Sequence, residues 1–67
     1  MLGARIAALR KDAGLSQAEL AAQLQISASA MGMYEQGRRE PSAQVLVEIA
    51  RILGVSEQNL LQNIRHK

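Results

Sequence analysis

The sequence predicts an all-α fold on three observations. Ala is the commonest residue, with 11 of 67 positions, and Ala and Leu favour helices over strands. Apolar residues recur at three- and four-residue spacing, and no segment alternates apolar and polar residues as a half-exposed strand does. Serines that can begin a helix and glycines that can end one divide the chain into short segments. We therefore expect a single domain, residues 1–67, built from five short helices.

Two helices are expected in the N-terminal part of the chain. The first covers residues 2–13 and is followed by Gly14, which can adopt the left-handed backbone that ends a helix. Ser16 and Glu19 have the spacing of a capping box, which predicts a second helix over 17–24. The apolar residues expected to face inward from these two helices are Leu2, Ile6, Leu9, Ala13, Leu20, Ala21 and Leu24.

Three further helices follow the same pattern of serine caps. The caps Ser27, Ser42 and Ser56 precede helices that we expect over 28–36, 43–53 and 57 to about 64. The residues expected to form the inner faces of these three helices are Met31, Tyr34, Leu46, Ile49, Ala50, Leu53 and Leu60.

Composition excludes several classes of protein. There is no Cys, the lone His66 is the penultimate residue, and the six acidic residues have no metal-ligand spacing. We therefore expect no enzyme activity, no metal, no cofactor and no small-molecule ligand. No apolar run approaches the roughly 20 residues that cross a bilayer. Arg5 and Arg10 interrupt the apolar N-terminal stretch, so a signal peptide is not expected and a cytoplasmic location is.

The second and third predicted helices are joined by a very short turn. Only Gln25 and Ile26 stand between the second helix and the cap Ser27, which predicts a steep crossing, as in a helix-turn-helix. Ala21 is small enough to let the two backbones approach. The same pattern also suits two helices of an all-α protein-interaction bundle, so DNA binding and protein binding both stay open at this point.

Several segments together resemble one family. They are LSQAELA at 15–21, IS at 26–27, YEQGRREPS at 34–42, IA at 49–50 and LGVS at 53–56. Their order and spacing, from about Ile6 to Leu61, resemble the Cro/repressor-type (lambda-repressor-like, XRE) helix-turn-helix family. The resemblance implies a five-helix lambda-repressor-like DNA-binding domain, with a helix-turn-helix unit at 16–36 and a recognition helix at about 28–36.

The resemblance also implies a function. It implies a bacterial or phage transcriptional regulator, in most such proteins a repressor, which binds double-stranded operator DNA through the major groove as a homodimer. The alternative is a helical interaction module, or an antitoxin-like protein that binds a partner protein and has weak DNA binding or none. The net charge of +2 is too small to decide between them.

The site residues are expected from the family's mode of docking. Base contacts are expected from Ala28, Ser29 and Met33. Phosphate contacts are expected from Arg10, Gln17, Ser27, Arg38, Arg39 and Gln44. Ala28 and Met33 can read only the methyl group of thymine, so direct readout is expected to be modest and DNA shape to contribute much of the selectivity.

Two positions have a further expected role or a departure from the family. Arg10 and Glu35 are expected to form a surface ion pair that contributes about 0–1 kcal/mol and orients Arg10. Gln25 occupies the turn where relatives usually carry Gly, so a positive φ there is expected to cost about 1 kcal/mol.

A surplus of apolar residues predicts dimerisation. Once the inner faces of the last two helices are assigned, five apolar residues remain: Val45, Val47, Ile52, Leu61 and Ile64. We expect a dimer interface on the fifth helix and the adjoining side of the fourth, at Ile52, Leu61 and Ile64. The alternative is that Leu61 and Ile64 cover the end of the core and the others are scattered surface residues.

Overall fold

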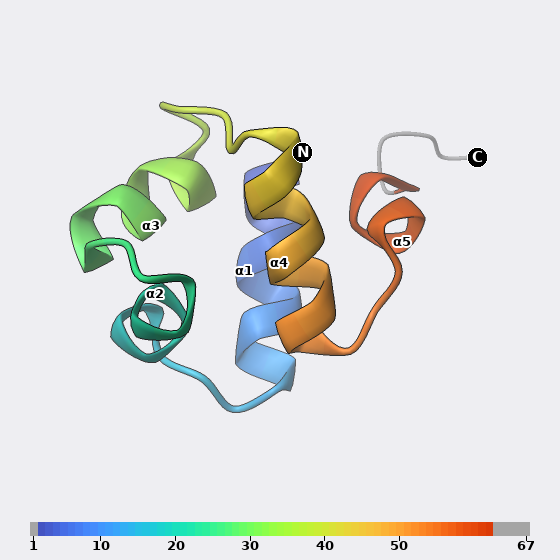
Figure 1. The fold of residues 1–67 in the computed structure, drawn as a ribbon, viewed down its shortest axis with the longest axis horizontal. Helices are drawn as coiled ribbons and strands as arrows, with labels where there is room; N and C mark the ends of the chain where they lie inside the picture. The colour runs from blue at the N-terminus through green and yellow to red at the C-terminus, as the bar shows by residue number, and fades with distance from the viewer. Residues whose placement is uncertain (1, 63–67) are drawn as a thin grey trace.

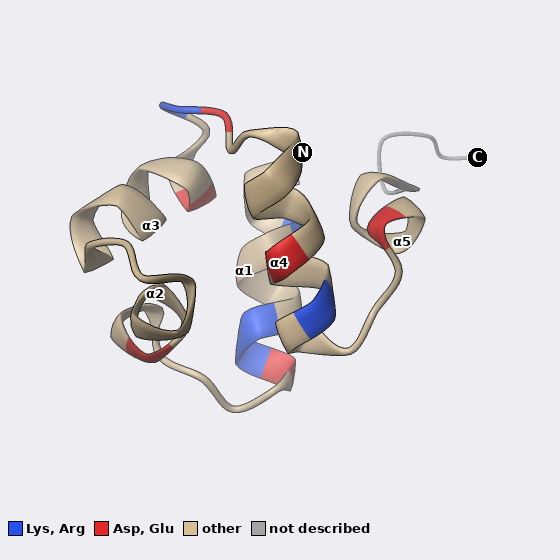
Figure 2. Ribbon diagram, viewed as in Figure 1, with Lys and Arg blue, Asp and Glu red and all other residues tan. Residues whose placement is uncertain are grey.

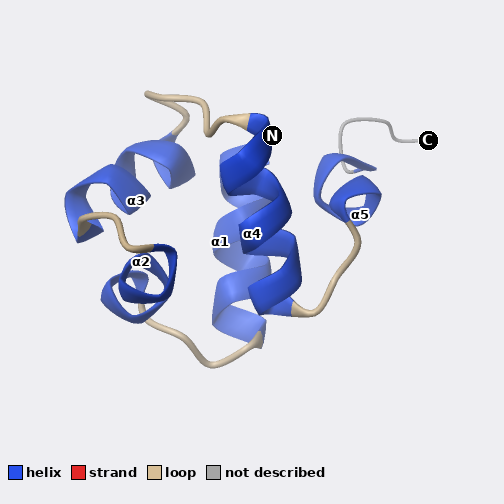
Figure 3. Cartoon of the chain, viewed as in Figure 1, coloured by secondary structure: helices blue, strands red, loops and turns tan. Residues whose placement is uncertain are grey.

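A computed structural model describes residues 2–62, and all of its regular structure is helical (Figure 1). Loops join the helices, and no strand occurs within this range (Figure 3), so the all-α prediction is confirmed. The first helix ends one residue earlier than predicted, and Ala13 is exposed in the following turn instead of facing inward. Residues 63–64 of the fifth predicted helix lie outside the described part. The helices are α1 Leu2–Asp12, α2 Gln17–Leu24, α3 Ala28–Gln36, α4 Ala43–Leu53 and α5 Glu57–Gln62.

Serine caps begin four of these helices, as predicted. At α2 the backbone N–H of Glu19 donates to Ser16 Oγ at 3.0 Å, and the Ser16 N–H donates to Glu19 Oε1 at 2.8 Å, which completes the capping box. Such caps satisfy backbone N–H groups that have no partner within the helix. The other serine hydroxyls accept from the third following residue: Ser27 from Ala30, Ser42 from Val45 and Ser56 from Asn59.

The helices lie in three parts across the molecule. α2 and α3 lie together on one side of the molecule, α5 lies on the other, and α1 and α4 run between them (Figure 1). α3 packs against both α2 and α1, whereas α5 packs against α1 and α4. α2 also contacts α4, so the helix-turn-helix pair is held against the rest of the fold from two directions.

The core is made almost entirely of aliphatic side chains. The half-buried Leu46 and Leu53, predicted as core, pack against its edge. Val45 and Ile52, predicted as surplus, also pack there, so part of the predicted apolar surplus is in fact core. Without Phe or Trp, many small side chains are needed to cover the same area. The buried cluster is Ile6, Leu20, Ala21, Met31, Tyr34, Ile49, Ala50 and Leu60.

Gly3 lets α1 approach α3 closely. A Cβ atom at this position would lie 2.5 Å from the carbonyl oxygens of both Tyr34 and Glu35. Backbone atoms at that distance cannot move aside as a flexible side chain can. The start of α1 and the end of α3 are therefore in direct backbone contact, which Gly permits because it has no side chain.

The turn between α2 and α3 has the predicted strained residue. Gln25 has φ 61° and ψ 39°, the left-handed conformation, as expected for the position where relatives usually carry Gly. This turn ends α2: the N–H of Ile26 donates to the carbonyl of Ala21 at 3.0 Å. α2 is seen nearly end-on and α3 from the side in Figure 1, so the two helices cross steeply.

Two methionines of α3 provide a matched test of which side of this helix is buried. Met31 is fully buried, whereas Met33 is 39% exposed. Met31→Ala is expected to lower the free energy of unfolding by about 2–5 kcal/mol, because it leaves a cavity in the core. Met33→Ala is expected to change it by less than about 0.5 kcal/mol. Urea unfolding followed by circular dichroism measures both, and equal effects of the two variants would contradict the orientation of α3.

Candidate nucleic-acid interface

The exposed side of α3 carries the residues predicted to contact bases. Ala28, Ser29 and Met33 are all exposed, while Met31 and Tyr34 face the core. Ser29 and Met33 are four residues apart and therefore lie on the same side of the helix. The structure thus leaves the start of α3 available to a groove of DNA.

Ser27 and Gln17 stand at the first turns of α3 and α2. Ser27 Oγ accepts the N–H of Ala30 at 3.0 Å, which leaves the hydroxyl proton able to donate to a phosphate. Gln17 is the first residue of α2, where backbone N–H groups and the helix dipole favour an anion. Its side-chain Nε2 donates to Glu35 Oε1 at 2.9 Å, so the amide is held in place by α3.

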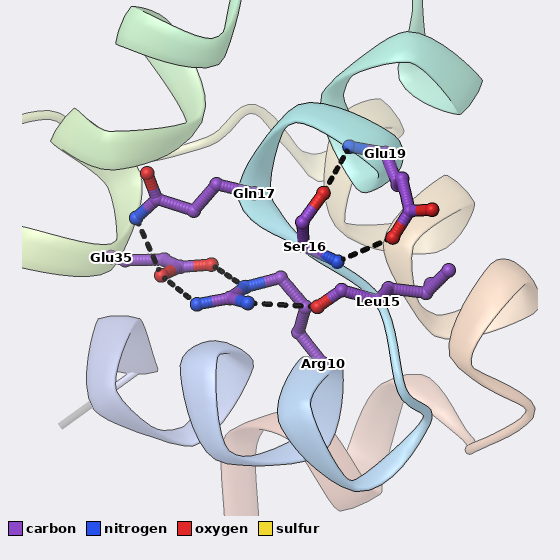
Figure 4. A network of polar contacts seen from close by, with 6 residues as sticks. All are labelled: Arg10, Leu15, Ser16, Gln17, Glu19 and Glu35. Atoms are coloured by element: carbon purple, nitrogen blue, oxygen red, sulfur yellow. Dashed lines mark hydrogen bonds and ion pairs between the residues drawn. The ribbon is translucent and has the colours of Figure 1, made fainter.

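A buried ion pair connects α1 to α3. Arg10 donates from Nε to Glu35 Oε2 at 2.6 Å and from Nη2 to Oε1 at 3.0 Å, the bidentate arrangement shown in Figure 4. The two side chains are only 8% and 6% exposed. The predicted ion pair is therefore confirmed, whereas its predicted place at the surface, and with it the value of about 0–1 kcal/mol, is wrong. Removing one partner of a buried pair leaves an uncompensated charge and typically costs about 3–5 kcal/mol.

The remaining nitrogen of Arg10 is also used inside the protein. Nη1 donates to the carbonyl oxygen of Leu15 at 2.8 Å, in the loop before α2. All three guanidinium nitrogens of Arg10 thus have partners in the chain, and the residue is buried. The structure gives Arg10 a positioning role, because Arg10 holds Glu35 and Glu35 holds Gln17. The phosphate contact of Arg10 stays a prediction.

Electrostatics favour the charged form of both partners. Burial raises the pKa of Glu35, but hydrogen bonds from Arg10 and Gln17, together with the charges of Arg10 and Lys11, outweigh it and hold the pKa below its ordinary value. The hydrogen bond with Glu35 raises the pKa of Arg10 despite the opposing effect of burial. The carboxylate therefore stays ionised at neutral pH.

The loop between α3 and α4 brings two arginines beside the end of α3. Arg38 and Arg39 are both exposed, and the basic colour of this loop stands at the edge of the helix-turn-helix side in Figure 2. The N–H of Arg38 donates to the carbonyl of Met33 at 3.0 Å, after the left-handed Gly37. Gln44 is exposed in the first turn of α4, where the same loop ends.

Gln36 is a candidate phosphate-contact residue that the sequence analysis missed. A Cβ built on Gly32 would lie 3.7 Å from Gln17 Oε1 and 3.9 Å from Gln36 Nε2, so both amides lie over the same glycine. Gln36 is one helical turn after Gly32, and this spacing was the available signal. Gln36 becomes a candidate because its amide lies near the amide of Gln17. Gln17 belongs to α2, and no pattern within α3 indicates that the two side chains meet.

The residues predicted for the dimer interface differ in how exposed they are. Leu61 on α5 is 40% exposed and borders a hollow lined by Ser56, Gln58 and Asn59. Ile52 is half-buried and packs against the core, and its place in a dimer interface stays a prediction. Ile64 lies outside the described residues. Val47, on α4, is 46% exposed.

Two further observations concern residues 2–62 alone. This part contains no group of three or more His, Cys, Asp or Glu side chains that could hold a metal ion. None of its five helices combines the length and the apolar character that crossing a membrane requires.

Comparisons of the sequence place this arrangement in a family. The sequence profile of the helix-turn-helix domain matches residues 1–62. The chain belongs to the helix-turn-helix family of transcriptional regulators. An HTH-type transcriptional regulator of Sinorhizobium fredii is 38% identical over 61 residues, which cover 91% of this chain and 79% of that protein. The regulator YazB of Bacillus subtilis is 41% identical over 58 residues, covering 87% and 84%.

Solved structures agree with this assignment. ClgR, the clp gene regulator of Corynebacterium glutamicum, superposes with a TM-score of 0.87 at 33% identity, over 91% of this chain and 65% of that one. The chain thus spans just under two thirds of ClgR. The biofilm regulator SinR, solved in complex with DNA, superposes with a TM-score of 0.84 at 35% identity, over 91% and 98%. These likenesses confirm the lambda-repressor-like fold predicted from the sequence.

The buried ion pair predicts acid sensitivity. Because the pKa of Glu35 is lower in the folded chain than its ordinary value of 4.5, the unfolded chain takes up the proton more readily. The contribution of Glu35 to the free energy of unfolding is therefore complete above pH 4.5 and is lost as the pH falls through the folded pKa. Urea unfolding of the wild type and of Glu35→Gln from about pH 7 to pH 3 measures this: their difference is expected to shrink as the pH falls.

A double variant serves as the control. Glu35→Gln alone leaves Arg10 buried without its counter-charge, whereas Arg10→Met with Glu35→Gln removes both charges. The double variant is expected to be more stable than the single one and to lack this part of the pH dependence. A single variant as stable as the double at neutral pH would contradict the role given to the ion pair.

Proposed function

We propose that the protein represses transcription by placing α3 in the major groove of operator DNA. The observation that carries the proposal is the coupling of Gln17 to α3 through Glu35, which sets a phosphate-binding helix start at a defined distance from the exposed residues of α3. A helix-turn-helix needs this arrangement, because phosphate contacts position the unit while base contacts specify the sequence. The likeness to SinR, whose structure contains DNA, supports it.

The residues divide into two roles in this proposal. Bases would be contacted by Ala28, Ser29 and Met33, all exposed at the groove-facing side of α3. Phosphates would be bound from the flanks of the unit, by the two helix starts and by the basic loop. Arg10 and Glu35 would act through Gln17, and Arg10 stays a proposed phosphate contact as well. The other residues of the phosphate-binding set are Gln17, Ser27, Gln36, Arg38, Arg39 and Gln44.

A homodimer is part of the proposal. One helix-turn-helix covers too few base pairs for useful specificity, and paired units read half-sites about 34 Å apart. The exposed Leu61 on α5 supports an interface at this end of the molecule, opposite α2 and α3 (Figure 1). Such a dimer would act in the cytoplasm of a bacterial cell, where its DNA target is.

Phosphate contacts are expected to dominate the affinity for DNA. If a dimer binds about six phosphates, the logarithm of the association constant should fall with the logarithm of salt concentration at a slope near −5. Arg38→Ala with Arg39→Ala should weaken binding to all sequences about equally and reduce the slope by roughly 0.9 for each phosphate that the variant no longer binds. Fluorescence anisotropy at several salt concentrations measures both quantities.

Arg51 provides the matched control for this experiment. It is an exposed arginine on α4, outside the helix-turn-helix unit, and pairs with Glu48 on the same helix. Arg51→Ala should leave the slope unchanged. Affinity independent of salt, or no binding to any duplex, would instead favour the alternative of a protein-interaction module.

The dimer is expected to depend on α5. Leu61→Glu should abolish self-association, because it places a charge in the proposed apolar interface, and should leave the fold intact, because Leu61 is exposed. Sedimentation equilibrium at high protein concentration is the measurement. Ala22→Glu, which puts the same charge on the exposed face of α2, should leave association unchanged. A wild-type chain that stays monomeric and binds two half-sites without cooperativity would refute the dimer.

A further inference from the structure

The groove-facing side of α3 has an unusual chemistry for a DNA-reading surface. α3 contains one charged residue, Glu35, and its carboxylate faces inward onto Arg10 and Gln17. The exposed residues at the start of the helix are Ala28 and Ser29, followed by Met33 one turn later. This part of the helix therefore offers one hydroxyl and two apolar side chains, with no group able to make a bidentate hydrogen bond to a base.

Met33 is the largest exposed apolar side chain of α3. Its side chain is 39% exposed, while that of Met31, two residues earlier, is completely buried in the core. An unbranched thioether chain adapts its shape to an apolar partner at little cost. In the major groove the one apolar group on a base edge is the 5-methyl group of thymine.

We propose that Met33, together with Ala28, reads thymine methyl groups, so that each half-site requires thymine at one or two defined positions. The inference rests on the proposed function, since it needs α3 to lie in the major groove. Ser29 can donate or accept and therefore discriminates little between bases. The preference for thymine then comes from apolar contact, not from hydrogen bonds.

The size of the effect follows from the burial of one methyl group. Transfer of one such group from water to an apolar contact changes affinity by about 3- to 5-fold. Removing one methyl group from each of two half-sites should weaken binding by about 9- to 25-fold in all, since the free energies of well-separated positions are roughly additive. The effect of one methyl group is smaller than that of a bidentate Arg–guanine contact. It is therefore best measured by comparing two duplexes that differ at one position.

Deoxyuridine provides the test, because it differs from thymidine by the methyl group alone and keeps the pairing with adenine. A site is first selected from random duplexes with the wild-type protein. Each thymine of that site is then replaced in turn by deoxyuridine, and affinities are measured at low salt. The wild type is expected to bind about 3- to 5-fold more weakly at one or two positions per half-site.

Variants at Met33 identify the side chain responsible. Met33→Ala should bind the thymine and uracil duplexes equally at the position that Met33 contacts, and it should remain folded because Met33 is exposed. Met33→Leu, which keeps an apolar side chain, should preserve the ratio. Gln36→Ala, also exposed on α3, serves as the matched control and should weaken both duplexes by the same factor.

The outcomes separate the inference from the proposed function. A wild type that selects a site and tolerates uracil at every position overturns the thymine contact and leaves operator binding intact. An unchanged thymine preference in Met33→Ala likewise overturns the role of Met33. Failure to bind any duplex overturns both.

Discussion

The bidentate ion pair between Arg10 and Glu35 fixes how α1, α3 and the start of α2 lie relative to one another. It joins residues 25 positions apart, and both charges are almost completely shielded from water. A buried charge is tolerated only while its partner keeps the right distance and direction. α1 and α3 are therefore held in one relative position. The same carboxylate binds Gln17 and the same guanidinium binds the carbonyl of Leu15, which extends this restraint to the start of α2.

The DNA-facing side combines this fixed polar framework with an apolar reading surface. Hydrogen bonds determine where the start of α2 lies relative to α3, and the basic loop with Arg38 and Arg39 adds charge at the edge. The exposed part of α3 itself provides mainly van der Waals contact. Under the proposed function, affinity would come from the framework, which would meet the same phosphates on every sequence, and selectivity would come from small contacts and from the shape of the groove.

Much of the fold was predictable because its signals are local. A serine cap acts within a few residues, so Ser27 was identified from the sequence itself, whereas the strained Gln25 was identified through the resemblance to the family. How deeply a residue is buried depends instead on packing between helices, which is not visible in a short stretch of sequence. Arg10 is buried only because α1 and α3 pack together and bring Glu35 to it, and Ile52 is half-buried only because α4 packs against the core. Gln36 was missed for the same reason, since Gln17 lies beside it only after α2 and α3 cross.

The close approach at Gly3 limits how this protein can evolve. Every other amino acid would place an atom 2.5 Å from two backbone oxygens at the end of α3, so the two helices would have to separate. Glu35 belongs to that stretch of α3, and its contacts with Arg10 and Gln17 would shift with it. Under the proposed function, a residue outside the base-contacting surface would then change the tilt of the helix that reads the bases. Random mutagenesis should therefore recover loss of operator binding at residue 3 as readily as on the DNA-facing surface.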